Sequence, residues 1–141
     1  RIHRKPPRRP ESFGHPAESV QELPQRPRIH MDGREVFRFA VDSVSASITR
    51  TLAQGGLAPG DVDWYVCHQA NQRILKAVAK RLDVPLERFF CNIGHRGNTS
   101  AASIPLALDE LHRSGLLRRG QRVVLSGFGG GLTYGSLYFI W

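Results

Sequence analysis

The sequence predicts an α/β domain in which helices pack on a mixed β-sheet. Two stretches carry apolar residues every three or four positions, which is the spacing of one helix face. Short continuous apolar runs bounded by turn residues indicate buried strands between these helices. With 141 residues and 40% apolar composition, the chain has the size and core material of one domain, which we place at residues 29–141.

The first helix is predicted to begin at Asp32, because Asp followed three residues later by Glu35 has the spacing of a capping box. Its apolar face comprises Phe37, Val41, Val44, Ile48 and Leu52. Gly55 ends the helix. A turn at residues 58–61 then leads into a buried strand at Trp64–Cys67.

Asn71 begins the second helix, and Asp83 and Pro85 close it. Its core-facing residues are Ile74, Leu75, Val78 and Leu82. Residues 89–91 are predicted to form a second short strand, followed by a loop at 92–97.

A helix rich in small residues follows at 99–114, and its Ala and Ser content suggests deep burial. Residues 123–126 and 133–140 are the last two strands, which turn at the glycines of residues 129–131. The predicted order is helix, strand, helix, strand, helix and two strands, as in a layered α/β domain with a mixed sheet.

Residues 1–28 are predicted to be a flexible, basic, proline-rich arm. They hold seven of the twenty Lys and Arg, three of the twelve acidic residues and six of the nine prolines. Because aliphatic residues are few, burial cannot offset the entropy of ordering this stretch. Clustered Arg and Lys could bind nucleic acid. The body shows no recognition helix or zinc spacing, so a solvated tail is favoured over a nucleic-acid contact.

The two cysteines, Cys67 and Cys91, are too few for a secreted disulfide framework and lie in apolar segments. The sequence shows no signal peptide and no apolar run of membrane-spanning length. A reducing, cytoplasmic setting without a membrane is therefore expected.

Three segments carry the groups of an incomplete catalytic site: residues 68–71, 97–105 and 127–131. His68 follows a buried strand, at the edge where ligands bind in open α/β sheets. Asn98 follows a glycine that permits close approach, and the glycine turn could direct backbone N–H groups at an oxyanion. Each feature also has a structural interpretation, as a packed histidine, a helix cap or a hairpin turn.

No convincing nucleophile or metal site accompanies these groups. Cys67 and His68 are adjacent in a strand, so their side chains point to opposite faces. Cys91 lies in an apolar segment that would raise its pKa, and both cysteines are interpreted as core residues. His95 and His112 lack the spacing of zinc ligands, so no metal is expected.

The second helix carries Arg73, Lys76 and Lys80 on one exposed face, and Arg81 follows them. Such a face is usually a solvated helix surface. It becomes a docking face if the substrate arrives on an acidic partner.

Taken together, these motifs resemble β-ketoacyl-acyl-carrier-protein synthase III of the thiolase superfamily. The resemblance rests on residues 68–71, 97–110 and 127–135 and on the helix opening at 31–37. It runs in order from about Ile29 to Trp141 and covers the C-terminal half of the family pattern. It implies a thiolase-like fold of two pseudo-duplicated halves, and a homodimer in the intact family.

The resemblance implies a decarboxylative Claisen condensation. A cysteine takes an acyl group from acyl-coenzyme A, and the acyl-enzyme condenses with malonyl-acyl carrier protein. The thioesters are substrates, and no cofactor is implied. His68 and Asn98 would donate hydrogen bonds to the malonyl thioester oxygen, and Gly130 would supply an oxyanion-hole N–H.

Further roles are implied by position. Phe128 would line the site. The matches to pantetheine-contacting positions are Gly33, Phe37 and Asn71. The matches to the patch that docks the acidic carrier protein are Arg38, Arg73, Lys80 and Arg81.

The chain departs from the family pattern in one respect that bears on function. The nucleophilic cysteine belongs to the N-terminal half, and neither Cys67 nor Cys91 matches it. We therefore expect a C-terminal half that is inactive alone and needs a missing N-terminal half or partner subunit. The alternative is a non-catalytic module that binds carrier protein or pairs with a ketosynthase. The sequence does not identify the primer acyl chain. It also does not distinguish the initiation of fatty acid synthesis from that of polyketide synthesis.

Overall fold

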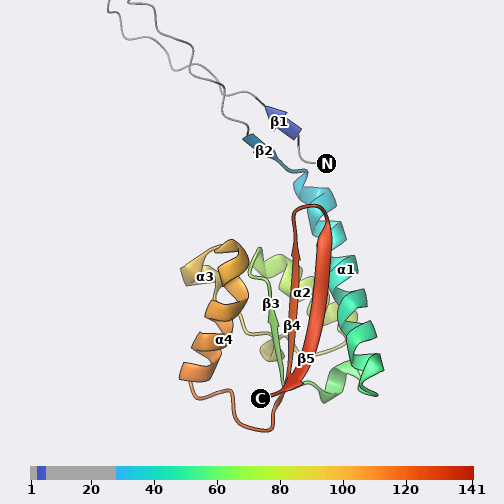
Figure 1. Ribbon diagram of the computed structural model, residues 1–141, viewed down its shortest axis with the longest axis vertical. Helices are drawn as coiled ribbons and strands as arrows, with labels where there is room; N and C mark the ends of the chain where they lie inside the picture. Colours follow the sequence, from blue (N-terminus) through green and yellow to red (C-terminus); the bar gives the residue numbers. More distant parts are fainter. Residues whose placement is uncertain (1–2, 6–27) are drawn as a thin grey trace, which may run out of the picture.

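The computed structural model describes residues 3–5 and 28–141 of the chain (Figure 1). Two short strands, β1 (His3–Lys5) and β2 (Arg28–His30), pair antiparallel. The rest of the predicted arm, residues 1–2 and 6–27, lies outside the described residues, so its flexibility stays a prediction. Strand β2 precedes Asp32, where the first helix is predicted to begin.

The main sheet has three strands in the order β3 (Trp64–Cys67), β4 (Arg122–Gly129) and β5 (Thr133–Ile140). Strands β3 and β4 are parallel, and Cys67 lies opposite Ser126. Strands β4 and β5 are antiparallel, in a hairpin whose last pair is Gly129 with Thr133. The sheet is therefore mixed, as the sequence predicts.

Helices cover both faces of this sheet, and Figure 1 shows α1 and α4 on opposite sides of it. Helix α1 (Gly33–Gln54) and helix α2 (Gln72–Leu82) share one core with strand residues Tyr65, Cys67 and Val124. Helix α4 (Ser103–Arg113) shares the other core with Val66 and Val123. Because alternate strand residues face opposite sides, one short sheet supports both cores.

The predicted helix caps are confirmed. The Asp32 Oδ1 atom accepts the backbone N–H groups of Arg34 at 2.9 Å and Glu35 at 3.1 Å, so Asp32 starts α1. Asn71 starts α2 in the same way, accepting from the Arg73 N–H at 2.9 Å. Asp83 ends α2 in the left-handed conformation, with φ of 55°.

The predicted strand at 89–91 is wrong. A 3-10 turn, η2 (Leu86–Arg88), comes just before these residues. Of the three, only Phe89 forms an isolated β-bridge, which pairs it with Tyr65. Phe89 is buried because its ring stacks on Tyr65 at 4.6 Å between centroids. Cys91 is exposed, so its interpretation as a core residue is also wrong.

The segment after this bridge also differs from the prediction. Residues 92–97, predicted as a loop, contain the short helix α3 (Ile93–Arg96). The helix predicted at 99–114 begins with a 3-10 turn, η3 (Ser100–Ala102), and becomes α-helical at Ser103. Its deep burial is not observed. Only Ser103, Ala107 and Leu111 are buried, because nothing in the described part of the chain covers its outer face.

The glycine turn between β4 and β5 is confirmed. Gly131 and Leu132 adopt positive φ angles of 80° and 53°, in the left-handed region that glycine enters most readily. A further 3-10 turn, η1 (Pro59–Asp61), leads into β3. Among the described residues, no helix has the length and apolar character needed to cross a membrane.

Candidate functional site

His68 lies directly after β3, at the carboxyl end of the strand. Its backbone N–H donates to the Ser126 carbonyl at 2.8 Å, which extends the β3–β4 ladder by one residue. Its ring meets the Phe128 ring edge-on, with centroids 5.1 Å apart. The structure therefore brings together two of the predicted site residues, His68 just after β3 and Phe128 in β4.

The environment of His68 favours the neutral imidazole. The side chain is half-buried, and removal from water lowers the pKa of His68 below its ordinary value of 6.5. The Nδ1 atom lies 2.6 Å from the hydroxyl oxygen of Ser103, the first residue of α4. At neutral pH the ring can therefore present an N–H donor without carrying a charge.

Asn98 lies in the exposed loop between α3 and η3, after Gly97, whose φ is 69°. Its Oδ1 atom accepts the Ser100 backbone N–H at 3.0 Å. The amide oxygen is thereby occupied, and the NH₂ group is left as the donor. Asn98 is not the cap of α4, because four residues separate it from Ser103.

An open groove of about 1100 Å³ lies between the amino ends of α1 and α2. It collects six of the predicted site residues from separate parts of the sequence: Gly33, Phe37, Arg38, Asn71, Arg73 and Asn98. The Arg73 guanidinium lies 5.9 Å from the centre of the Phe37 ring, a cation–π contact across the groove wall. Ala70, two residues after His68, also lines the groove.

The remaining predicted residues lie outside the groove lining. Gly130 is exposed in the β4–β5 turn, where its carbonyl accepts the Thr133 hydroxyl at 3.3 Å. Lys80 and Arg81 are exposed farther along α2, and Arg81 pairs with Asp42 of α1. The four predicted docking residues are thus spread along the exposed edges of α1 and α2.

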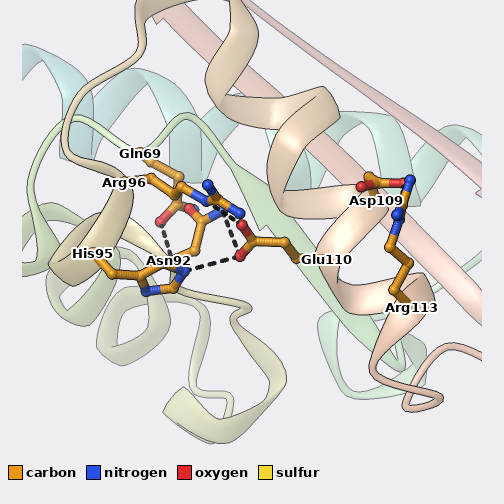
Figure 2. Close-up of polar contacts among 7 residues, drawn as sticks. All are labelled: Gln69, Asn92, His95, Arg96, Asp109, Glu110 and Arg113. Atoms are coloured by element: carbon orange, nitrogen blue, oxygen red, sulfur yellow. Dashed lines mark hydrogen bonds and ion pairs between the residues drawn. The ribbon is translucent and has the colours of Figure 1, made fainter.

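A buried polar network beside His68 was missed by the sequence reasoning (Figure 2). Gln69 is fully buried, and its Nε2 group donates to the carbonyls of Cys67 at 2.9 Å and Phe90 at 3.1 Å. Its Oε1 atom accepts the Asn92 backbone N–H at 3.1 Å. These partners lie up to 23 residues away in sequence. No local pattern could have revealed them.

The network continues to α4 through Glu110. Figure 2 shows its carboxylate directed at Asn92, His95 and Arg96. Asn92 Nδ2 donates to Oε2 at 3.1 Å, His95 Nε2 lies 3.1 Å from the same oxygen, and Arg96 binds Oε1. Because α3 leads directly into Gly97 and Asn98, Glu110 anchors the segment that carries Asn98.

We expect Glu110→Gln to lower the free energy of unfolding at neutral pH. The variant's stability should also depend less on pH in the acid range. Hydrogen bonds from Arg96 first, and from Asn92 and His95, hold the pKa of Glu110 below its ordinary value of 4.5. A carboxyl with a depressed folded pKa stabilises the fold above its unfolded pKa. That stability is lost as the pH falls from about 4.5 through the folded pKa. Urea midpoints at pH 7 and at pH 4 measure both effects.

Asp109→Asn is the matched control, since Asp109 is half-exposed and pairs with Arg113 on the helix surface at 2.9 Å. Surface i,i+4 pairs contribute little. An equal loss in the two variants would contradict the anchoring role of Glu110.

The two cysteines lie in different surroundings. Cys67 is buried in the core of α1 and α2, and burial raises the pKa of its thiol to about 12. Cys91 is exposed on the short segment between η2 and α3. Within residues 3–5 and 28–141, no cluster of three or more His, Cys, Asp or Glu side chains could hold a metal ion.

Comparisons with known proteins agree with this arrangement. The model of the family described as 3-oxoacyl-[acyl-carrier-protein] synthase III, C-terminal part, matches residues 52–141. The β-ketoacyl-[acyl-carrier-protein] synthase III of Microcystis aeruginosa is 51% identical over 122 residues, which are 86% of this chain and 36% of the relative. The chain spans about a third of the length of such relatives.

Solved structures give the same result. The 3-oxoacyl-[acyl-carrier-protein] synthase III of Aquifex aeolicus superposes with a TM-score of 0.79 at 42% identity, over 80% of this chain and 37% of that one. The priming β-ketosynthase of the R1128 polyketide pathway superposes with a TM-score of 0.76 at 41% identity, over 84% of this chain and 36% of that one.

The helices on both faces of a mixed sheet, with His68 at a strand end, define a thiolase-like fold. Within that class, the chain belongs to the β-ketoacyl-[acyl-carrier-protein] synthase III family and corresponds to its C-terminal part. Both predictions made from the sequence, the family and the fold, are confirmed.

Proposed function

We propose that this chain supplies the enolate-stabilising part of a decarboxylative condensing site. The reaction joins an acyl primer from acyl-coenzyme A to malonyl-acyl carrier protein and initiates fatty acid or polyketide synthesis. One observation carries the proposal: a neutral His68 and an Asn98 whose amide oxygen is already occupied, so that both side chains have an N–H to donate.

The chemistry requires such donors. Loss of carbon dioxide from the malonyl thioester leaves its electron pair on the thioester enolate. The enolate carbon attacks the carbonyl of the acyl-enzyme, and the cysteine thiolate leaves. Hydrogen bonds from His68 and Asn98 to the enolate oxygen lower the barrier to decarboxylation, and removing one such donor costs about 2.7–4 kcal/mol. A protonated His68 would carry its charge at a cost in this half-buried position.

The second oxyanion forms when the enolate attacks the acyl-enzyme. In our proposal the Gly130 N–H, in the exposed β4–β5 turn, donates to that oxygen. Phe128 lines the site through its ring contact with His68. Glycine suits position 130 because it leaves its backbone N–H open to a substrate.

The groove between α1 and α2 fits the proposed route of the pantetheine arm. Gly33, Phe37 and Asn71 line it, and Asn98 lies on its wall. Phe37 offers an apolar surface, while Asn71 and Asn98 offer amides that suit the amide bonds of pantetheine. In this proposal the thioester reaches the site through the groove.

The nucleophile of the proposed reaction comes from outside these 141 residues. The raised pKa of Cys67 keeps its thiol protonated in the core, and Cys91, which is exposed, does not match the nucleophile position of the family. We propose that an N-terminal half or partner subunit brings the cysteine, and that the intact synthase is a cytoplasmic homodimer. No cofactor is proposed beyond the coenzyme A thioester substrate.

A docking module without catalysis is the second candidate. It is favoured by the basic residues that the chain carries along α1 and α2, and by the burial that keeps the Cys67 thiol protonated. The test assembles the chain with a nucleophile-bearing half and measures carbon dioxide release from malonyl-acyl carrier protein. Release that depends on both parts supports the condensing site. Carrier binding without release supports the docking module.

We expect the double variant Arg73→Glu/Lys80→Glu to weaken binding of the acidic carrier protein at least about tenfold at low salt, because like charges then face each other. Added salt should shrink the difference, since exposed charges are screened. Surface plasmon resonance at two salt concentrations measures both effects. Arg118→Glu/Arg119→Glu, a matched charge change in the exposed turn before β4, should leave binding unchanged. An equal loss in this control would contradict docking on α2.

A further inference from the structure

The hydroxyl of Ser103 links the start of α4 to the catalytic candidate His68. Ser103 is 2% exposed, and its Oγ atom lies 2.6 Å from His68 Nδ1 and 3.3 Å from the backbone nitrogen of Gln69. Both contacts reach across 34 or 35 residues of sequence. A buried hydroxyl therefore lies between a peptide N–H and an imidazole nitrogen.

The direction of each hydrogen bond follows from the groups involved. The Gln69 N–H can only donate, so it occupies a lone pair of the Ser103 oxygen. If His68 Nδ1 also carried a proton, the oxygen would accept twice, and the hydroxyl hydrogen would need a third partner at this buried position. Within the described residues, His68 Nδ1 is the acceptor in contact with this hydroxyl. The hydroxyl therefore donates to Nδ1.

We propose that Ser103 is a positioning residue that fixes neutral His68 in the tautomer protonated at Nε2. With Nδ1 engaged as an acceptor, the single ring proton lies on Nε2, which becomes the donor available to a substrate oxygen. Because the Gln69 N–H holds the Ser103 oxygen from the other side, the hydroxyl hydrogen is directed at the imidazole. This proposal rests on the proposed function for its catalytic meaning, but the tautomer itself is a property of the chain without substrate.

The first measurement is nitrogen NMR of the imidazole in the ¹⁵N-labelled 141-residue chain at neutral pH. We expect a protonated Nε2 and an unprotonated, hydrogen-bonded Nδ1 in the wild type. In Ser103→Ala, the two nitrogen shifts should move toward each other as the second tautomer becomes populated. Ser103→Thr keeps the hydroxyl and should restore the wild-type shifts. Ser100→Ala, an exposed hydroxyl three residues earlier, should change nothing.

A proton on Nδ1 in the wild type would overturn the proposal, even if Ser103→Ala failed to fold. Unchanged shifts in a folded Ser103→Ala would overturn it as well. In the assembled synthase, Ser103→Ala should lower kcat with an unchanged KM. The expected loss is roughly ten- to a hundredfold, the range found when partners that orient metal-bound histidines are removed. If condensation is absent altogether, the proposed function fails while the tautomer result still decides the role of Ser103.

Discussion

Replacement of His68 or Asn98 by alanine is expected to lower the condensation rate of the assembled synthase by about a hundred- to a thousandfold each. Each side chain offers one N–H donor, His68 from its half-buried neutral ring and Asn98 from the amide whose oxygen accepts the Ser100 N–H. The loss should appear in carbon dioxide release from malonyl-acyl carrier protein, followed with labelled substrate.

The same variants should still form the acyl-enzyme, because neither side chain is the nucleophile. His112→Ala is the matched histidine control, since His112 lies against Trp141 at the far end of α4, with ring centroids 5.3 Å apart. It should keep full activity. Loss of acyl transfer with normal carbon dioxide release in His68→Ala or Asn98→Ala would reverse the roles we assign.

Leu111→Ala is expected to destabilise the fold by about 2–5 kcal/mol. Leu111 is fully buried in the core beneath α4, together with Ala107, Val66 and Val123. Only three α4 residues are buried, and Leu111 is the largest of them, so its truncation removes most of the apolar anchor of this helix. Urea unfolding at neutral pH measures the change in free energy.

Leu116→Ala is the control for this prediction, because Leu116 is 51% exposed just after the same helix. It should change the free energy of unfolding by less than about 0.5 kcal/mol. Equal effects of the two substitutions would show that α4 does not pack on the sheet as described.

Local signals in the sequence predicted most of the elements correctly. Asp32 and Asn71 cap their helices as their positions indicate, and the glycine turn between β4 and β5 forms where predicted. Such signals act within a few residues, so a single sequence displays them. The mixed sheet follows from the order of these elements.

The errors lie where partners distant in sequence decide the structure. Residues 89–91 are apolar enough for a strand, but only Phe89 finds a strand partner, and Cys91 is left exposed. The contacts of Glu110 with Asn92 and Arg96 depend on the way α4 lies across α3. The small residues of the α4 segment indicate that another element packs closely against this helix. They do not identify which part of the chain that element is.

The candidate site likewise has a part that the sequence predicted and a part that only the structure revealed. The motifs around His68 and Asn98 pointed to stabilisation of an oxyanion, and their resemblance to the family indicated the reaction. The contact between Ser103 and His68 could not be predicted, because a Ser at the start of a small-residue helix carries no sign of its partner. The structure supplied that contact.

The separation of the donors from the nucleophile is tested most directly by acyl-enzyme formation. The purified chain is incubated with radiolabelled acetyl-coenzyme A, alone and together with a nucleophile-bearing half, and the labelled residues are mapped by mass spectrometry. We predict no label on the chain alone, because the pKa of Cys67 is raised to about 12 in the core and neither Cys67 nor Cys91 matches the nucleophile position of the family. We predict label only on the added half. Stoichiometric acylation of Cys67 or Cys91 would contradict this division of the site.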